Sequence, residues 1–396
     1  METNEATEPT PPLSNLSLPN GGARITRIEL GRFEAVRPRS AGSNARLGEH
    51  GLHVRPPVVR LTTDDGNSGF GLAFISPAQA EMLLGVTIGE AFTGADIGVQ
   101  LPFRAIEFPL WDLAAKAAGL PVYALLSQAP NPEPLRVRCY DTSLYIDDLH
   151  LTDTSEAAAL IAQEARDGFE RGHRAFKIKV GRGARHMPLE EGTRRDIAVI
   201  RTVREAVGPD ATLMIDANNG WNLNLTKRVL DETADCRLYW VEEAFHEDAV
   251  LYRDLKGWLT ERNLPILIAD GEGEASPSLI RWAKEGLIDV LQYDIFGHGI
   301  SRWIELGHNI ADTQIGSGPH HYGAMLGNYV TGHLSRALPR FQYVEWDEAI
   351  TPGIAAPGYT VENGMVVVPD TPGFGLTLDE TLFQETIRAN GFAVSL

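Results

Sequence analysis

The sequence predicts an α/β fold in which a closed parallel barrel of strands and helices follows an N-terminal α+β region. Two observations predict it. Short apolar runs alternate with helical patterns from residue 136 to residue 350, which is typical of a (β/α) barrel. Ahead of this alternation, the chain carries a hairpin pattern and one long helical pattern instead. With 396 residues, 43% of them hydrophobic, the chain is long enough to bury a large core.

The N-terminal region is expected to begin after a disordered tail, residues 1–23, which is rich in Pro, Ser, Asn, Thr and Glu. This tail lacks the basic start and apolar run of a signal peptide. In residues 24–135, Val58–Phe74 predicts two strands around an Asp-Asp-Gly turn, and Phe103–Leu126 predicts a helix. The polar stretch Arg37–Arg55 predicts a long loop that acts as a mobile lid.

Residues 136–350 are expected to form the barrel. Helical patterns such as Glu191–Val207 and Ser276–Gly286 separate the apolar runs. An open, doubly wound sheet is the alternative, but no Gly-x-Gly-x-x-Gly motif follows a first strand to support a dinucleotide-binding version of it. The predicted strands are Arg136–Tyr140, Ala175–Val180, Thr212–Ile215, Leu238–Val241, Ile266–Ala269, Val290–Tyr293, Thr313–Ile315 and Gln342–Val344.

The last segment, residues 351–396, returns to turns and short strands. We expect it to fold back on the N-terminal region.

Ionisable side chains end every predicted barrel strand from the second to the eighth. In such barrels the active site lies at the carboxyl ends of the strands. Lys177 and Lys179 are two residues apart on one strand, so both ammonium groups share a face and predict an anionic group opposite them. The other residues at the strand ends are Asp216 and Asn218, Glu242 and Glu243, Asp270 and Glu272, Asp294, His320 and His321, and Glu345 and Asp347.

Carboxylates from the ends of strands three, four and five would converge on one point. Oxygen ligands in that number suit a hard divalent cation such as Mg²⁺, which keeps positions open for substrate or water. Any one of these carboxylates alone would as readily cap the following helix or pair with an arginine. The neighbouring lysines and histidines complete a set that favours a metal-dependent active site.

In this combination of motifs the chain resembles the enolase superfamily, and within it the mandelate racemase subgroup. The resemblance covers residues 25–375 and rests on the helix pattern near Trp111, the Lys-x-Lys motif and the residues that end the strands. It implies a modified (β/α)₇β barrel under an α+β capping domain that the C-terminal segment completes. It also implies three ligands for Mg²⁺, an Asp–His dyad and a last-strand carboxylate, which are Asp216, Glu242, Glu272, Asp294, His320 and Glu345.

Two positions in this alignment have neighbouring alternatives. The fifth strand ends in Asp270-Gly271-Glu272, and the resemblance favours Glu272 as the ligand, with Asp270 behind it. The resemblance also favours the histidine that follows the proline, His320, as the dyad member. His321 would then be a spectator or a substrate contact.

The resemblance implies that the shared step is removal of the proton α to a carboxylate. Lys179 is the candidate base, with its pKa lowered by the adjacent cations Lys177 and Mg²⁺. His320 would act on the opposite face of the substrate, oriented by Asp294. Glu345 would donate a hydrogen bond to the substrate carboxylate, which requires it to be protonated when substrate is bound.

Several reactions share these residues, and the resemblance favours dehydration of an acid sugar, an aldonate or aldarate, to a 2-keto-3-deoxy acid. Racemisation or epimerisation and cycloisomerisation are alternatives, as is a non-catalytic binding protein. Asn218 is a candidate contact for the metal shell or the substrate. In the lid, His50, His53 and Arg55 would meet the far end of the substrate or remain solvated.

Composition limits the partners and the compartment. The formal net charge is −18, which argues against binding nucleic acid or an anionic membrane surface but allows a small anionic substrate in a local cationic pocket. Two cysteines, Cys139 and Cys236, do not make a disulfide framework, and no stretch is apolar enough to cross a membrane. We expect a cytoplasmic homo-oligomer.

Overall fold

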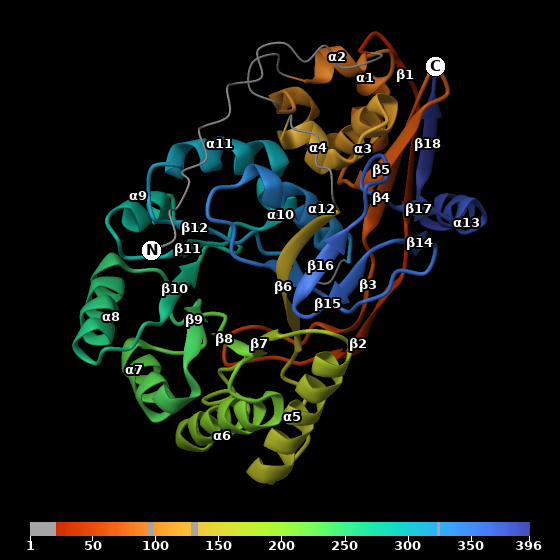
Figure 1. Ribbon diagram of the computed structural model, residues 1–396. Helices are drawn as coiled ribbons and strands as arrows, with labels where there is room; N and C mark the ends of the chain where they lie inside the picture. The colour runs from red at the N-terminus through yellow and green to blue at the C-terminus, as the bar shows by residue number, and fades with distance from the viewer. Residues whose placement is uncertain (1–20, 93–97, 128–133, 274, 323–324) are drawn as a thin grey trace.

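The computed structural model describes residues 21–92, 98–127, 134–273, 275–322 and 325–396 (Figure 1). Its largest feature is a closed barrel of parallel strands, because β6 pairs with both β7 and β13, and backbone bonds from Ser317 to the segment 340–342 join β12 to β13. The predicted barrel is confirmed, and the open-sheet alternative is wrong. The strands are β6 (Leu135–Leu144), β7 (Ala175–Lys179), β8 (Thr212–Asp216), β9 (Leu238–Glu242), β10 (Leu267–Asp270), β11 (Val290–Leu291), β12 (Gly316–Ser317) and β13 (Val344–Trp346).

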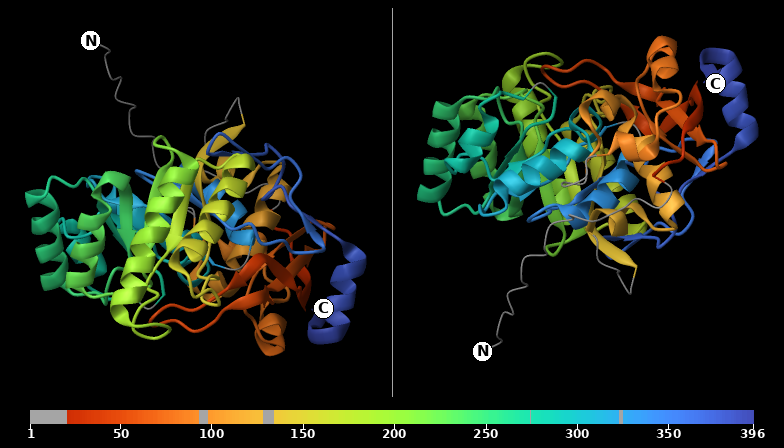
Figure 2. Two further views of the ribbon diagram at one scale, coloured as in Figure 1. Left: turned by 90° about the horizontal axis from the view of Figure 1, so that it is seen from below. Right: turned by 90° about the horizontal axis from the view of Figure 1, so that it is seen from above.

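Helices surround the barrel (Figures 1 and 2). Alternate residues of each strand point outward or inward, so that Phe176 and Ile178 of β7 pack in the large helix-lined core. The inward-facing residues Tyr140, Met214 and Trp240 fill the barrel interior instead. The covering helices are α5 (Thr154–Glu170), α6 (Leu189–Val207), α7 (Leu223–Glu232), α8 (Ala249–Glu261), α9 (Leu279–Lys284), α10 (Ile295–His298), α11 (Ile300–Ile310) and α12 (Leu326–Leu334).

The capping region is built from both ends of the described chain. Its sheet has the order β18-β1-β4-β5, in which β18 (Phe392–Ser395) pairs antiparallel with β1 (Ile25–Arg32). Strands β4 (Pro57–Thr63) and β5 (Ser68–Leu72) form the predicted hairpin. Figure 2 shows the N-terminal strands and α13 on the same side of the molecule. The helices here are α1 (Pro77–Leu83), α2 (Ile88–Ala91), η1 (Leu101–Ile106), α3 (Glu107–Ala118), α4 (Val122–Ser127) and α13 (Glu380–Asn390).

The C-terminal segment also contacts the barrel. β16 (Met365–Val368) pairs antiparallel with β6 and carries β15 (Thr360–Glu362) at its outer edge, while the short strands β14 (Ile354–Ala355) and β17 (Thr377–Leu378) pair with each other. We propose the predicted boundaries near residues 24, 136 and 351 as the domain limits. Residues 1–20, most of the predicted tail, lie outside the described residues.

The predicted long loop at Arg37–Arg55 is largely a hairpin. β2 (Ala35–Ala41) pairs antiparallel with β3 (Gly51–Val54), while residues 42–50 between them and Arg55 after them lack strand structure. The polar composition of β2 is typical of a loop and does not indicate a strand. Its arginines, Arg37 and Arg39, contact polar and aromatic groups at the rim of the barrel and do not pack in an apolar core.

Two short barrel strands are shifted from their predicted positions. The seventh lies at 316–317, not 313–315, because the Thr313 hydroxyl bonds the Ile310 carbonyl and continues the turn after α11. The eighth begins at Val344, two residues after the predicted start at Gln342. Both cysteines are free and buried, and in the described part of the chain no helix is both long and apolar enough to cross a membrane.

Candidate active site

The register of the parallel strands places three charged residues in one row. Lys179 of β7 lies opposite Asp216 of β8, and Asp216 lies opposite Glu242 of β9. Each is the last residue of its strand, so the row follows the carboxyl edge of the barrel. Strand-end position in the sequence is therefore sufficient to bring these side chains together.

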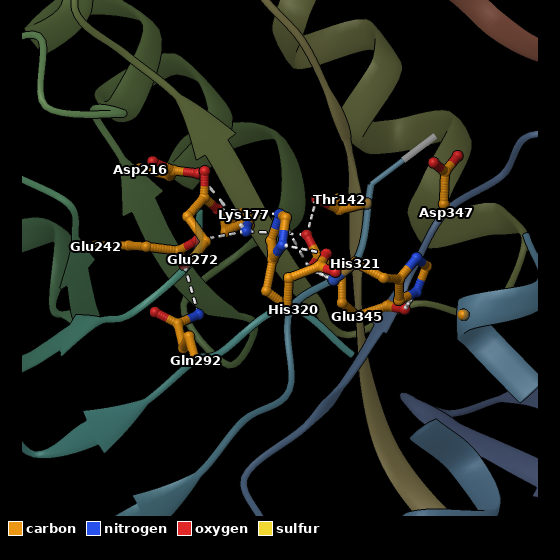
Figure 3. A network of polar contacts seen from close by, with 12 residues as sticks. Thr142, Lys177, Asp216, Glu242, Glu272, Gln292, His320, His321, Glu345 and Asp347 are labelled. Carbon is orange, nitrogen blue, oxygen red and sulfur yellow. Dashed lines mark hydrogen bonds and ion pairs between the residues drawn. The ribbon is translucent and has the colours of Figure 1, made fainter. Parts of the chain in front are cut away.

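The third carboxylate, Glu272, reaches the row through a turn after β10. Gly271 makes this turn with φ of +126°, and an added Cβ there would lie 3.2 Å from the backbone nitrogen of Gln292. One oxygen each of Asp216, Glu242 and Glu272 then lies within 4.8 Å of the others (Figure 3). The structure thus brings together the three predicted ligands.

The chemistry of this donor set fits Mg²⁺. All three groups offer hard oxygen atoms, and Asp216 and Glu242 are fully buried. Burial raises the pKa of Glu242 to about 8; Lys177 opposes this increase, while Asp216 and Glu272 add to it. A divalent cation relieves this crowding of negative charge. Trp240 Nε1 and Gln292 Nε2 donate to the second oxygen of Glu242, at 3.0 and 2.9 Å, and fix its orientation.

Asp270, the alternative ligand, faces away from the row. It accepts hydrogen bonds from the Tyr252 hydroxyl at 2.5 Å and from the Gly271 N–H at 2.7 Å. Burial raises its pKa to about 8. These contacts support Glu272 as the ligand and Asp270 as a buried group behind it.

Lys177 and Lys179 have different surroundings. Lys177 is fully buried, with Nζ 2.7 Å from Glu242 Oε1 and 2.9 Å from Glu345 Oε1, and it does not line the cavity. Lys179 lines the cavity and lies 2.5 Å from Asp216 Oδ2. The structure therefore separates a buried lysine that neutralises carboxylates from one that faces the substrate space.

The direction of the Lys179 pKa shift differs from the expectation. Burial and Lys177 lower this pKa, but the carboxylates of Asp216, Glu272 and Glu242 raise it more, and the net pKa lies above its ordinary value. The carboxylate of Asp216, directly opposite Lys179, outweighs the neighbouring cation Lys177. A metal ion held by Asp216 would compete with the lysine for that carboxylate and would favour the neutral amine.

His320 occupies the expected dyad position. Its Nδ1 lies 3.1 Å from Asp294 Oδ2, and its Nε2 lies 3.0 Å from Glu272 Oε2. A backbone bridge between Asp294 and His320 sets this pairing. Burial lowers the pKa of His320. Glu272, Glu345 and the hydrogen bond to Asp294 raise it by more than burial lowers it, so the net pKa lies above its ordinary value.

His321 points away from the carboxylate cluster (Figure 3). It is fully buried, and its Nε2 donates to the Glu345 carbonyl at 2.6 Å. Its backbone N–H donates to Glu345 Oε2 at 2.9 Å. The proposed substrate contact is not seen, because His321 holds the last barrel strand and does not line the cavity.

Glu345 is held as an ionised carboxylate. Thr142 Oγ1 donates to its Oε1 at 2.7 Å, and Lys177 pairs with the same oxygen. Burial raises the pKa of Glu345, but Lys177, His320 and His321 lower it more, so the net pKa lies well below its ordinary value. Protonation of Glu345 when substrate is bound stays a prediction, and it would have to overcome the ion pair with Lys177.

Asn218 hydrogen-bonds both Lys179 and the predicted metal ligand Glu272. Its Oδ1 accepts from Lys179 Nζ at 3.0 Å, and its Nδ2 donates to Glu272 Oε1 at 2.8 Å and to Glu243 Oε2 at 3.1 Å. Asn218 also lines the cavity, as predicted for a residue at the edge of the metal shell or a substrate contact.

Two of the predicted substrate-binding residues do not line the cavity. His53 and Arg55 lie outside it, on an exposed surface where Glu34 pairs with both, at 3.1 and 3.9 Å. In an extended strand, neighbouring side chains alternate in direction, and sequence alone does not say which face is inward. The lining residues are Ala41, Gly42, Asn44, Leu47, His50, Tyr145, Ile146, Lys179, Asn218, Glu272, His320 and Tyr322.

The segment 42–50 is docked on the barrel mouth by backbone contacts. The Ala45 N–H donates to the Gly181 carbonyl at 2.7 Å, and a Cβ at Gly42 would lie 1.8 Å from the Ile146 carbonyl oxygen. Asn44 Nδ2 donates to the Ala217 carbonyl at 2.6 Å, directly beside the ligand Asp216. The segment therefore covers part of the cavity in this structure, and its opening and closing as a lid stays a prediction.

Asn44→Ala is expected to loosen this lid. Asn44 is buried, and its Oδ1 also accepts the N–H groups of Arg46 and Leu47. Leaving these buried groups unpaired costs about 1–3 kcal/mol locally. Amide exchange of residues 42–47, followed by mass spectrometry, should accelerate by about tenfold or more on that scale. Asn309→Ala, which removes an exposed partner of Lys284, is the control. Unchanged exchange in Asn44→Ala would contradict the docking role.

The chain belongs to the enolase superfamily, because residues 160–382 match the family described as "Enolase C-terminal domain-like". This is the mandelate racemase and muconate lactonizing subgroup. A galacturonate dehydratase variant from a Geobacillus species, in complex with Mg, superposes with a TM-score of 0.93 at 45% identity, covering 96% of this chain and 100% of that one.

Two further relatives give the range of the similarity. The Geobacillus galacturonate dehydratase complexed with D-galacturonate and 5-keto-4-deoxy-D-galacturonate has a TM-score of 0.89 at 46% identity, covering 94% of this chain and 99% of that one. D-Galactarolactone cycloisomerase from Agrobacterium fabrum is 27% identical over 364 residues, which are 83% of this chain and 90% of the relative.

Proposed function

We propose that this protein is a Mg²⁺-dependent dehydratase of a sugar acid, and that D-galacturonate or a close uronate is its substrate. The observation that carries the proposal is that Lys179, His320 and the predicted ligand Glu272 line one cavity. Lys179, which can remove a proton, and His320, which is paired with carboxylates, thus both face the space beside the three predicted metal ligands. That is the arrangement needed to remove a proton α to a carboxylate and to assist a leaving hydroxyl.

Asp216, Glu242 and Glu272 are the residues that would hold Mg²⁺. The ion, when bound, supplies positive charge for the substrate carboxylate and for the negative charge that develops on it. Lys177 partly neutralises two of these carboxylates from behind, since its Nζ lies 3.6 Å from Asp216 and 2.7 Å from Glu242. Its role in this proposal is electrostatic.

Lys179 and His320 divide the proton transfers. Lys179 accepts the α proton, and the electron pair of the broken C–H bond forms a C=C bond as the β C–O bond breaks. His320 donates a proton to the departing hydroxide, which leaves as water. The enol product then becomes a 2-keto acid, because its hydroxyl loses a proton to form the C=O group while the β carbon gains a proton. Asp294 holds the His320 ring and fixes which nitrogen faces the cavity.

The Geobacillus enzyme, at 46% identity, supports a uronate as the substrate beside the aldonate or aldarate expected from the sequence. In D-galacturonate the carboxylate is C6, so the α proton is on C5 and the leaving hydroxyl is on C4. Loss of water gives 5-keto-4-deoxy-D-galacturonate, the second compound bound to the Geobacillus enzyme. The chemistry at the metal is the same for all three classes of acid, because each has a hydroxyl on the carbon β to the carboxylate.

Formation of a keto acid tests the proposal. Purified protein with Mg²⁺ and D-galacturonate should give a product that reacts with semicarbazide and shows a 4-deoxy methylene by NMR. Lys179→Ala and His320→Asn serve as matched controls, since both replace cavity-lining groups. A lactone or an epimer as the product, with no loss of water, would indicate cycloisomerisation or epimerisation and contradict the dehydratase assignment.

A further inference from the structure

The cavity has two ends of different character. One end holds the charged groups Lys179, Glu272 and His320. The other end is formed by aromatic and apolar side chains from the hairpin segment, the chain after β6 and the chain after β12, which are Leu47, His50, Tyr145, Ile146 and Tyr322. A sugar acid bound by its carboxylate at the charged end extends toward this second end.

Tyr322 is the centre of the uncharged end. The Arg37 guanidinium lies 4.7 Å from the centre of its ring, and the rings of His50 and Tyr145 meet it edge-on at 5.1 and 6.4 Å. Among the described residues, no side chain or backbone group hydrogen-bonds the Tyr322 hydroxyl. Burial raises the pKa of Tyr322, so this hydroxyl keeps its proton and can donate to a ligand.

Arg37, the arginine beside Tyr322, does not line the cavity. It is only 5% exposed, its Nη1 donates to the carbonyls of His50 and Gly51, each at 3.1 Å, and its buried Nε has no hydrogen-bond partner among the described residues. The two cationic groups that line the cavity, Lys179 and His320, both pair with carboxylates, and the Lys179 ammonium lies 5.9 Å from the centre of the Tyr322 ring. His50 is neutral at neutral pH, because burial, Arg37 and Lys179 lower its pKa and Glu272 opposes them only in part.

We propose that Tyr322 and His50 make this site selective for sugar acids with one carboxylate and an uncharged far end. This inference rests on the proposed function and narrows its substrate class. A hydroxyl or carbonyl at the far end can bond the Tyr322 hydroxyl and the ring nitrogens of His50. A second carboxylate would lose water against aromatic rings, and the cations that line the cavity are already paired with carboxylates, so its burial is unfavourable. Uronates and aldonates therefore fit, and aldarates do not.

The test compares D-galacturonate with galactarate, which has the same hydroxyl configuration but a carboxylate in place of the aldehyde. The Mg²⁺-loaded wild-type protein should prefer D-galacturonate by about 10²-fold or more in kcat/KM, on the scale of an unpaired charge in a desolvated site. Tyr322→Phe removes only the hydroxyl and should lower kcat/KM for D-galacturonate by about tenfold, mainly through KM.

His50→Arg should reduce the preference by about tenfold or more, because it places a cation at the far end. His53→Arg is the matched control: the same change, on the same hairpin, at an exposed position outside the cavity, should leave the preference unchanged. The inference is overturned if galactarate is used as well as D-galacturonate, or if both arginine variants shift the preference equally.

Calorimetry of the two acids with the Mg²⁺-loaded Lys179→Ala variant, in which turnover is suppressed, measures the same selectivity as binding, while keto acid formation is measured with the wild-type protein. Tighter binding of D-galacturonate with no keto acid formed would support the selectivity while contradicting the dehydratase assignment. Equal binding, together with keto acid from both compounds, would contradict the selectivity and leave the dehydratase assignment in place.

Discussion

Replacing Lys179 with alanine is expected to lower kcat for dehydration by about 10³-fold, the contribution typical of a positioned general base. Lys179 is the lysine that faces the cavity, whereas Lys177 lies behind the carboxylates with no exposed surface. The loss should appear in kcat and not only in KM, because Asp216, Glu242 and Glu272 remain to hold the Mg²⁺ that would bind the substrate carboxylate.

Proton exchange in ²H₂O separates the role of Lys179 from that of His320. The two groups contact the cluster through different ligands, Lys179 through Asp216 and His320 through Glu272. With a pair of acids epimeric at the α carbon, Lys179→Ala should abolish exchange from one configuration, and His320→Asn should abolish it from the other. Both variants should still bind Mg²⁺, since neither residue is a predicted ligand. Native exchange from both configurations in either variant would be incompatible with two opposed groups.

Asp216→Asn is expected to abolish Mg²⁺ binding and lower kcat/KM by about 10³-fold, a loss of several kcal/mol of charge stabilisation. Asp216 is the central member of the row, opposite Lys179 on one side and Glu242 on the other. Calorimetry should show about one Mg²⁺ per chain for the wild-type protein and none for the variant, on the stoichiometry expected of a three-carboxylate site. Removal of the metal by EDTA should abolish activity, and added Mg²⁺ should restore it.

Asp270→Asn is the matched control for the metal site. Asp270 is equally buried and has the same carboxyl group, but that group faces Tyr252 and Gly271, not the cluster. It should retain Mg²⁺ stoichiometry and most of the activity. If Asp270→Asn loses the metal and a Glu272→Gln variant keeps it, the third ligand has been assigned to the wrong residue.

The part of the site that could be predicted from the sequence lies on the barrel strands. A parallel strand that ends in a charged residue places that residue at the carboxyl edge of the barrel. The register of neighbouring strands then places such residues next to one another. The positions of Lys179, Asp216 and Glu242 could be predicted from the sequence alone, because each ends an apolar run in the sequence and a strand in the structure. The end of the helix at Glu107–Ala118 was also predictable, because Gly119 follows it and adopts the left-handed conformation, with φ of 68°, that commonly ends helices.

The rest of the site depends on contacts between distant segments. Tyr322 lies in the chain after β12, and its environment is set by Arg37 from the capping region, 285 positions away. No local pattern marks such a pair. The same reason explains His53 and Arg55: the direction of their side chains follows from how the hairpin lies on the barrel, which the residues of the hairpin do not specify. The Lys179 pKa likewise depends on a carboxylate from the neighbouring strand.

The pairing of β18 with β1 has a consequence for how the molecule is made. During synthesis β1, β4 and β5 emerge first, but the strand that covers the outer edge of β1 follows the whole barrel in the chain. That edge presents unpaired N–H and C=O groups to other chains for as long as the barrel is being translated. Because β18 is synthesised after every barrel strand, the N-terminal sheet cannot be completed until translation of the barrel has ended.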